Sequence, residues 1–201
     1  MTGIDPRNAL LDATELLIAL RGIEVPLRDI AAEAGQRNNS AVNYYFGSRA
    51  NLIDAAVERR IAEMETERFE RLAQHEADGT GHDVYALVDM LVRPIADLAR
   101  TGRSTHYARF LEIVRTHPAI TDAARLDAPD RTAVRIISTR LATRLDGPDA
   151  VRRIEWMRSA MFALLADQER RIEQHSGNPG TTEDIVTMLV GLLTAQRVSY
   201  Q

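Results

Sequence analysis

The side chains best equipped for chemistry lie close together near the N-terminus. They are amides, hydroxyls, phenol rings and guanidiniums, which all form directional hydrogen bonds. The group consists of Arg28, Arg37, Asn38, Asn39, Ser40, Asn43, Tyr44, Tyr45, Ser48 and Arg49. Asn can form two hydrogen bonds with adenine and Arg two with guanine, whereas Tyr and Ser hydroxyls mostly bind phosphate. The set predicts nucleic-acid contact, with Asn43 and Arg37 reaching bases or phosphates and the tyrosines, Ser40 and Arg49 clamping the backbone.

A short helix and a glycine turn are expected to come first among the elements that position these groups. Ile30, Ala31 and Ala34 fall on one face at helical spacing. Gly35 follows where a left-handed residue would end that helix, a conformation that glycine adopts without a Cβ penalty.

A second short helix is predicted over residues 40–46, with Asn38 or Asn39 as its cap. Val42 and Phe46, four residues apart, are expected to face inward. The alternative is that one of the two tyrosines packs inward instead. A helix this short is not stable alone, so its neighbours must hold it.

Caps and breakers divide the rest of the chain into helices. Asp5 and Gly22 are expected to bound the first, and Ser48 to open a long helix to about Gln74, whose charged later part (63–76) is expected to be solvated. The remaining predicted helices are 83–100, 104–116, 130–144, 148–174 and 182–198, with a single turn at 121–126. Since no strand pattern is evident, we expect an all-α chain of about nine helices.

The N-terminal pattern resembles the DNA-binding domain of the TetR family of bacterial transcription regulators. The matching residues are Asp29-Ile30-Ala31, Ala34-Gly35, Tyr44-Tyr45-Phe46 and Gly47-Ser48-Arg49 before Leu52-Ile53. The resemblance covers about residues 6–60; beyond them only the all-helical layout and the length agree. It implies a three-helix, helix-turn-helix DNA-binding domain at 1–48 and an effector-binding and dimerisation domain at 49–201, joined by helix 49–74.

The chain departs from the commonest family pattern in three places. The turn 35–39 is one residue longer than usual, Pro26 stands where a Ser or Thr cap is common, and Asn43 replaces a common Tyr. The first and third departures affect the surface that would read DNA. The resemblance therefore implies no particular operator sequence.

The resemblance also implies a pocket for a small-molecule effector between the helices of the second domain. Apolar walls with a few polar groups suit such a pocket. The candidate lining residues are Met90, Ile95, Tyr107, Phe110, Leu111, Trp156 and Met161. The alternative is that they are plain core. The identity of the effector does not follow from the sequence.

The last two predicted helices are apolar over wide arcs, and a second apolar face usually indicates a partner. The candidate interface residues are Val151, Ile154, Leu165, Ile185, Met188, Leu189 and Leu192. By the resemblance, these helices would pair with their copies in a homodimer. Two heads spaced roughly 34 Å apart would then read a palindromic operator in double-stranded DNA. The alternative is complete burial within one protomer.

Several other classes of protein are disfavoured. The chain has no Cys, no H-E-x-x-H or G-x-S-x-G motif and no phosphate-binding glycine loop, so we expect neither an enzyme nor a cofactor. Its five His show no i, i+4 pair, so no metal site is expected. No apolar run approaches the roughly 20 residues that span a membrane, and the N-terminus lacks the features of a signal peptide. We expect a cytoplasmic protein without a membrane partner.

Charge is the main objection to nucleic-acid binding. The net charge is −4, and residues 1–60 hold seven Arg against eight Asp or Glu. Binding then depends on where the charges lie. The favoured interpretation is a ligand-responsive, homodimeric repressor released from its operator by an effector. The alternative is an all-α small-molecule sensor or carrier with a non-functional DNA-binding head.

Overall fold

The computed structural model describes residues 5–36, 38, 40–102, 104–122, 128, 131–145 and 147–195. These residues form ten helices and no strand. The helices are α1 (Pro6–Arg21), α2 (Leu27–Glu33), α3 (Ser40–Phe46), α4 (Arg49–Ala77), α5 (Val84–Arg100), α6 (Tyr107–Val114), α7 (Pro118–Thr121), α9 (Thr132–Leu145), α10 (Ala150–Gln174) and α11 (Thr182–Thr194). The all-α prediction is confirmed.

The described residues form one helix more than the roughly nine expected. Pro118 begins the one-turn helix α7, because a proline at the first helical position needs no intrahelical N–H bond. The side chain of His117 accepts a hydrogen bond from the backbone N–H of Ala119 at 3.3 Å. Most of the single turn predicted at 121–126 lies outside the described residues.

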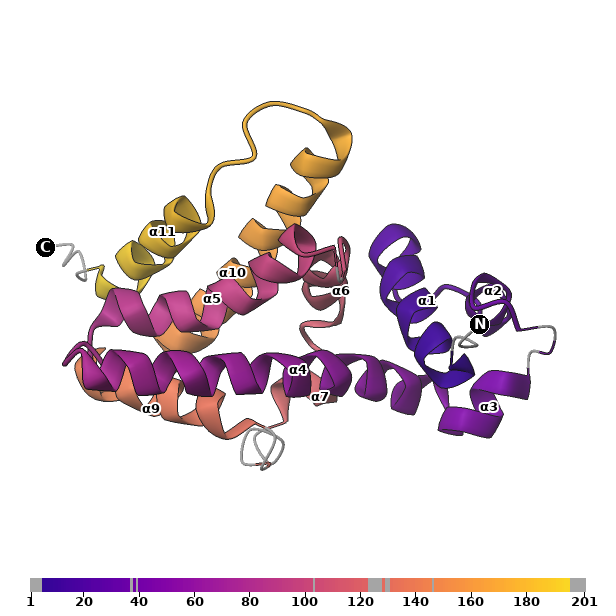
Figure 1. The fold of residues 1–201 in the computed structure, drawn as a ribbon, viewed down its shortest axis with the longest axis horizontal. Coiled ribbons are helices and arrows are strands. Elements are labelled where there is room, and N and C mark those ends of the chain that lie inside the picture. Colours follow the sequence, from indigo (N-terminus) through magenta and orange to yellow (C-terminus); the bar gives the residue numbers. More distant parts are fainter. Residues whose placement is uncertain are drawn as a thin grey trace, which may run out of the picture.

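The helices divide into a small head and a larger body (Figure 1). Helices α1, α2 and α3 form the head at one end of the molecule. Helix α4 starts at the head and runs along the body for 29 residues, with α5 and α9 packed beside it. Helices α10 and α11 pack on each other and on the far side of α5, and α10 also covers α6. A displacement in the body can therefore reach the head through α4.

Local sequence accounts for where several helices begin. Asp5 and Ser48 cap α1 and α4 by accepting backbone N–H groups at 3.2 Å and 3.1 Å. Thr181 and Asp184 form a reciprocal capping box at the start of α11. Pro26 precedes α2 without a side-chain cap, as the sequence predicted.

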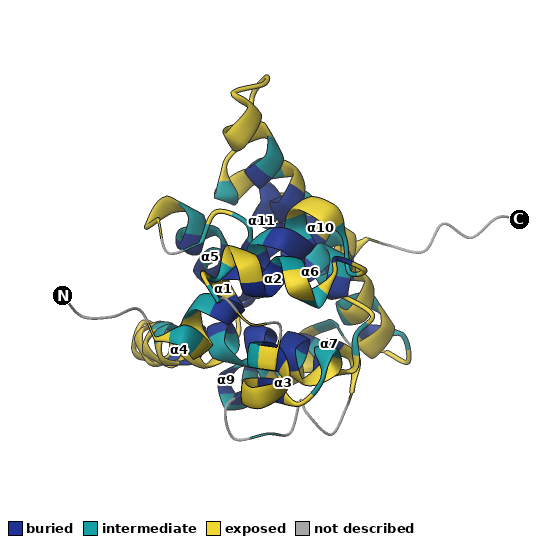
Figure 2. Ribbon diagram, turned by 90° about the vertical axis from the view of Figure 1, so that its right-hand side faces the viewer, coloured by how far each residue is buried: buried dark blue, intermediate teal, exposed yellow. Residues whose placement is uncertain are grey.

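Buried residues lie on the inner sides of the helices (Figure 2), and in the described part of the chain they include charged groups. The run 63–76 of α4 was expected to be solvated. This prediction is wrong at Glu65 and Arg68, which are only 7% and 4% exposed. Glu65 accepts the backbone N–H of Ala133 in α9, and Arg68 lines a cavity with residues of α9 and α10. A charge count along one helix cannot reveal such neighbours. None of the helices in the described ranges is long and apolar enough to cross a membrane.

Candidate nucleic-acid interface and effector cavity

Helix α3 buries its apolar side against the protein and exposes its polar side to solvent. Val42 is fully buried and Phe46 is 8% exposed, as the sequence predicted. Tyr44 is 82% exposed and Tyr45 38% exposed, and their rings meet edge to face with centroids 4.9 Å apart. Asn43 is also exposed. The alternative in which a tyrosine provides the inner anchor of α3 is therefore not what the structure shows.

The turns on both sides fix the direction of α3. Gly35 has a φ of 69°, the left-handed conformation that the sequence predicted for the turn after α2. Asn38 Oδ1 accepts the backbone N–H of Ser40 at 2.9 Å. After the helix, Asn51 Nδ2 donates to the carbonyl of Phe46 at 2.9 Å. Hydrogen bonds at both ends thus hold this two-turn helix, although it would not be stable alone.

Arg49 has a structural role that the sequence did not suggest. Its Nη1 donates to the carbonyl oxygen of Ile23 at 2.9 Å, and its Nη2 donates to that of Val25 at 2.7 Å. The guanidinium therefore joins the start of α4 to the loop before α2. We had expected Arg49 to clamp the DNA backbone, but its two terminal nitrogens are engaged within the protein.

The other predicted contacts with DNA differ in how the structure places them. Arg28 is solvent-exposed and only loosely paired, with Nε 3.4 Å from Asp29 Oδ1. Ser40 is exposed at the start of α3, and the hydroxyl of Ser48 caps α4. Arg37 and Asn39 lie outside the described residues.

A further cation in this region was missed from the sequence. The guanidinium of Arg7 lies 5.3 Å from the centre of the Phe46 ring, so an α1 residue stacks on the base of α3. No sequence signal identified this contact, because it joins residues 39 positions apart in the chain.

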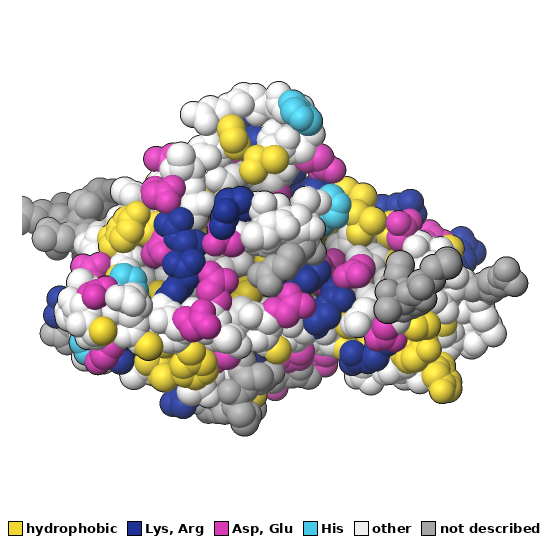
Figure 3. All heavy atoms as spheres, in the orientation of Figure 1, with side chains coloured by type: hydrophobic (Ala, Val, Ile, Leu, Met, Phe, Trp, Pro, Cys, Tyr) yellow, Lys and Arg dark blue, Asp and Glu magenta, His cyan; other side chains and the backbone are white. Residues whose placement is uncertain are grey.

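Acidic and basic side chains alternate over the face of the molecule in Figure 3, and neither sign forms a large continuous area there.

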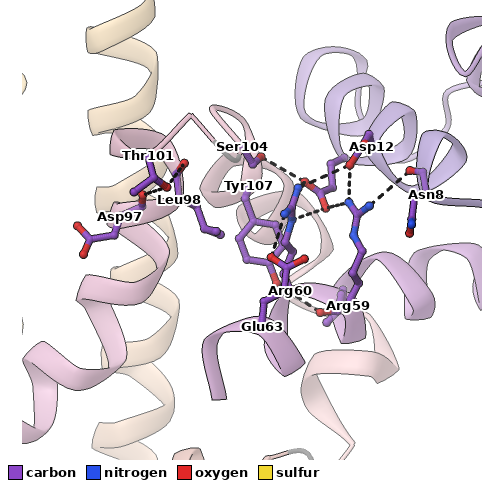
Figure 4. Close-up of polar contacts among 12 residues, drawn as sticks. Asn8, Asp12, Arg59, Arg60, Glu63, Asp97, Leu98, Thr101, Ser104 and Tyr107 are labelled. Atoms are coloured by element: carbon purple, nitrogen blue, oxygen red, sulfur yellow. Dashed lines mark hydrogen bonds and ion pairs between the residues drawn. The ribbon is translucent and has the colours of Figure 1, made fainter. Parts of the chain in front are cut away.

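A buried carboxylate joins the head to the body (Figure 4). Glu15 of α1 is 2% exposed, and its Oε1 lies 2.6 Å from Arg59 Nη2 and 2.9 Å from Arg60 Nε. Its Oε2 accepts from Ser104 Oγ at 3.2 Å, just before α6. Burial lowers the pKa of Arg60, but the hydrogen bonds that Arg60 donates to Glu15 and Glu63, together with the charges of these carboxylates, outweigh it, so the net shift is upward. One carboxylate thus connects α1, α4 and the segment leading to α6.

A small cavity of about 100 Å³ lies between α4, α5, α6, α9 and α10. Four of the seven residues predicted for an effector pocket line it: Ile95, Tyr107, Leu111 and Met161. Tyr107 is fully buried, and its hydroxyl is 3.5 Å from the carbonyl of Val57 in α4. Desolvation, with a smaller effect of Glu15, raises the pKa of Tyr107 well above its ordinary value, so the phenol stays neutral.

The other three predicted pocket residues lie elsewhere. Met90 and Phe110 are fully buried but do not line this cavity. Trp156 is 61% exposed on the outer face of α10. Met161, which was predicted to line the same pocket, is five residues further along α10, and helical spacing therefore places it on a different side of the helix.

Three arginines that sequence reasoning missed also line the cavity: Arg68, Arg131 and Arg158. They come from α4, the residue before α9, and α10. Arg68 falls in the charged run 63–76, which was expected to be solvated, and nothing in the sequence singled out Arg131 or Arg158. The only signal in the sequence was that Arg68 follows Ile61 and Met64 at helical spacing.

A larger, more open hollow of about 660 Å³ lies between α5, the start of α6, α10 and the α10–α11 loop. Glu169 lines it and accepts the backbone N–H groups of Ala108 and Arg109, both at 3.0 Å. Desolvation raises the pKa of Glu169 despite these two hydrogen bonds. The carboxylate therefore fixes the first turn of α6 to α10.

The predicted dimer residues divide into two groups. Val151, Met188 and Leu192 are 65%, 53% and 38% exposed, and Trp156 joins them as an exposed apolar residue of α10. The residues in the second group face the protomer's own core: Leu165, Ile185 and Leu189 are buried, and Ile154 is half-buried and lines the cavity.

These features define a class of protein: an all-helical protein with a helix-turn-helix head whose second helix projects exposed polar groups. Residues 10–56 match the family described as bacterial regulatory proteins, tetR family. The N-terminal segment is therefore similar to that family, as the sequence indicated, and the match covers this segment alone.

Known structures resemble the chain only distantly over its whole length. A candidate transcriptional regulator from Rhodococcus sp. RHA1 is 18% identical, with 94% of this chain and 95% of that chain covered and a TM-score of 0.47. A candidate TetR-family transcriptional regulator from Rhodococcus sp. is 21% identical, with 92% and 95% covered and the same TM-score. No curated protein matches the chain.

Proposed function

We propose that this protein is a homodimeric repressor that binds a palindromic operator and leaves it when a small molecule occupies the body. The observation that carries the DNA-binding part is the outer face of α3. Its exposed groups, Asn43, Tyr44 and Tyr45, stand on a helix held by hydrogen bonds at both ends. A recognition helix must combine such exposure with a fixed direction.

The proposed release works by a shift between two arrangements of the heads. A ligand in the 100 Å³ cavity would contact Tyr107 and Leu111 of α6. The segment before α6 is tied through Ser104 to Glu15 of α1. A ligand that prefers the arrangement with badly spaced heads would weaken operator binding, and by linkage DNA would weaken ligand binding equally. A preference of about 3–4 kcal/mol would reduce operator affinity a few hundredfold.

The homodimer is supported by the exposed apolar residues of α10 and α11. Val151 and Trp156 of α10 and Met188 and Leu192 of α11 are all large and exposed, and these two helices pack on each other. A second copy would cover them. Such a regulator would act in the cytoplasm, where its DNA target lies.

Fluorescence anisotropy tests the proposal directly. The probe is the DNA upstream of the protein's own gene, with a scrambled duplex as control, at two salt concentrations. We expect selective binding to the upstream DNA, with log K falling steeply with log salt because phosphate contacts release counterions. Equal weak binding to both duplexes, together with ligand binding by the body, would instead favour a small-molecule sensor or carrier whose DNA-binding head is non-functional.

A further inference from the structure

An unusual charge imbalance surrounds the cavity between α4, α5, α6, α9 and α10. Its lining includes Arg68, Arg131 and Arg158, and none of the described residues that line it is acidic. The remaining walls are apolar, apart from the hydroxyls of Tyr107 and Ser138. A low-dielectric cavity lined by charges of one sign attracts a ligand of the opposite sign.

Arg68 is buried and has almost no polar partner among the described residues. It is 4% exposed, and neither Nε nor Nη1 has a hydrogen-bond partner in the described part of the chain. Its Nη2 has only the thioether sulfur of Met64, at 3.9 Å. Desolvation lowers the pKa of Arg68, although the nearby Glu65 carboxylate opposes this. Glu65 is itself engaged by the backbone N–H of Ala133.

The other two arginines differ in how they are paired. Arg131 Nη2 lies 2.7 Å from Glu58 Oε1 and 2.7 Å from the carbonyl of Ala119, so this guanidinium has partners. Arg158 is half-buried and makes no hydrogen bond or ion pair with any described residue. Desolvation lowers the pKa of Arg158, and the exposed Glu155 of the same helix opposes this. The guanidiniums of Arg68 and Arg158 thus line one cavity, and both have N–H groups without an acceptor among the described residues.

A buried guanidinium without acceptors is costly, because each N–H loses water and gains nothing in return. Evolution can retain such a group where a ligand supplies the acceptors. A carboxylate fits best, because its two oxygens match the planar fork of a guanidinium. The apolar walls, which include Ile61, Leu91 and Phe162, would receive an uncharged hydrocarbon part.

We propose that the effector is a small organic acid, with a single carboxylate bound by Arg68 and Arg158 and an apolar body against the walls. This inference rests on the proposed effector function of the same cavity. The volume of about 100 Å³ is below the 300 Å³ or so of a pocket for a drug-sized ligand. The acid is therefore compact, on the scale of benzoate or hexanoate.

Ligand binding is tested first without DNA, on the purified full-length protein, by calorimetry and thermal melting. Benzoate and hexanoate are the acids, benzamide and hexanamide their neutral counterparts, and benzylamine the cation. We expect the acids to bind and to raise the Tm. The amides should bind about 10- to 100-fold more weakly, since they lose charge-assisted hydrogen bonds, and the amine should not bind.

Three variants locate the binding group. Arg68→Met should remove the preference for acid over amide, and Arg158→Met should reduce it. Arg135→Met serves as the matched control, because Arg135 is an exposed arginine of α9 that does not line the cavity, and it should leave the preference intact. Without ligand, Arg68→Met should melt no lower than the parent, since it removes a buried cation and keeps an apolar chain of similar length. That result would show that the variant folds.

The outcomes separate this inference from the proposed function. It is overturned if no acid binds, if acid and amide bind equally, or if Arg68→Met retains the preference. If an acid binds through Arg68 but leaves operator affinity unchanged, the anion site stands and effector-controlled release fails. If only a neutral or cationic compound releases the operator, effector-controlled release is supported and the proposed carboxylate site is overturned.

Discussion

At the scale of single residues, the exposed groups of α3 and the residues that hold this helix in place can be tested separately. Asn43 is exposed and has no hydrogen bond to a described side chain. Asn43→Ala should therefore leave the free energy of unfolding within about 0.5 kcal/mol of the parent. If Asn43 contacts a base, the variant should lose about 1–3 kcal/mol of discrimination at specific operator positions. Anisotropy with singly substituted operators measures this. An unchanged preference at every position would remove Asn43 from the reading surface.

Arg49 requires a different test, because its position combines a positive charge with a structural contact. Arg49→Lys keeps the charge but cannot reproduce the two hydrogen bonds to Ile23 and Val25. We expect a stability loss of about 1–3 kcal/mol, together with weaker binding to all DNA because the head is less well positioned. Arg28→Lys is the matched control, since Arg28 is exposed, and should change neither quantity much. Full DNA affinity and an unchanged Tm in Arg49→Lys would show that only the charge of Arg49 matters.

At the scale of elements, α6 lines the cavity and the segment before it contacts the head, and the histidine at the start of α6 is expected to make stability depend on pH. Burial lowers the pKa of His106, as does nearby Arg109, whereas Glu173 of α10 and Glu15 of α1 raise it slightly. The unfolded chain therefore takes up a proton at an ordinary His pKa, about 6.5, before the folded one does. The contribution of neutral His106 is complete above that pH and is lost as the pH falls below it.

His106→Gln should remove this part of the pH dependence. Between about pH 7.5 and pH 5.5, the Tm of the variant should fall less than that of the parent, because Gln acquires no charge beside Arg109. Thermal melting of both proteins across this range is the measurement. Parallel curves would mean that protonation of His106 does not affect the stability of α6.

One hydrogen bond between the segment before α6 and α1 can be removed mildly, although the two helices also pack on each other. Ser104→Ala deletes the donor to Glu15 Oε2 while Arg59 and Arg60 still hold the carboxylate. The expected stability loss is only about 0.5–1.5 kcal/mol. Operator affinity without ligand should stay close to that of the parent, and the loss of affinity on adding a ligand should be smaller. An equal ligand effect in parent and variant would show that the signal takes another route, such as α4 alone.

At the scale of the whole molecule, features set by neighbouring residues followed from the sequence, and features set by distant packing did not. The cap at Ser48, the left-handed Gly35 and the inward Val42 and Phe46 depend on contacts within a few residues, and the structure has all of them. The burial of Arg68 depends on α9 and α10, which lie more than 60 residues further along the chain. A charged stretch gives no indication that other helices will cover it.

The exposed apolar face of α10 and α11 carries the prediction for the assembled protein. Met188 is 53% exposed, so Met188→Arg should fold, but a second copy would then have to bury an unpaired charge against Val151, Trp156 and Leu192. Phe69→Arg is the matched control, because Phe69 is 42% exposed on α4, away from that face. Sedimentation at micromolar concentration should show a dimer for the parent and the control and a monomer for Met188→Arg. Since two linked heads gain about 10²- to 10⁴-fold in affinity over one, the monomer should bind a full palindrome hardly better than a half-site. A Met188→Arg protein that remained dimeric and bound the palindrome like the parent would exclude this face as the interface.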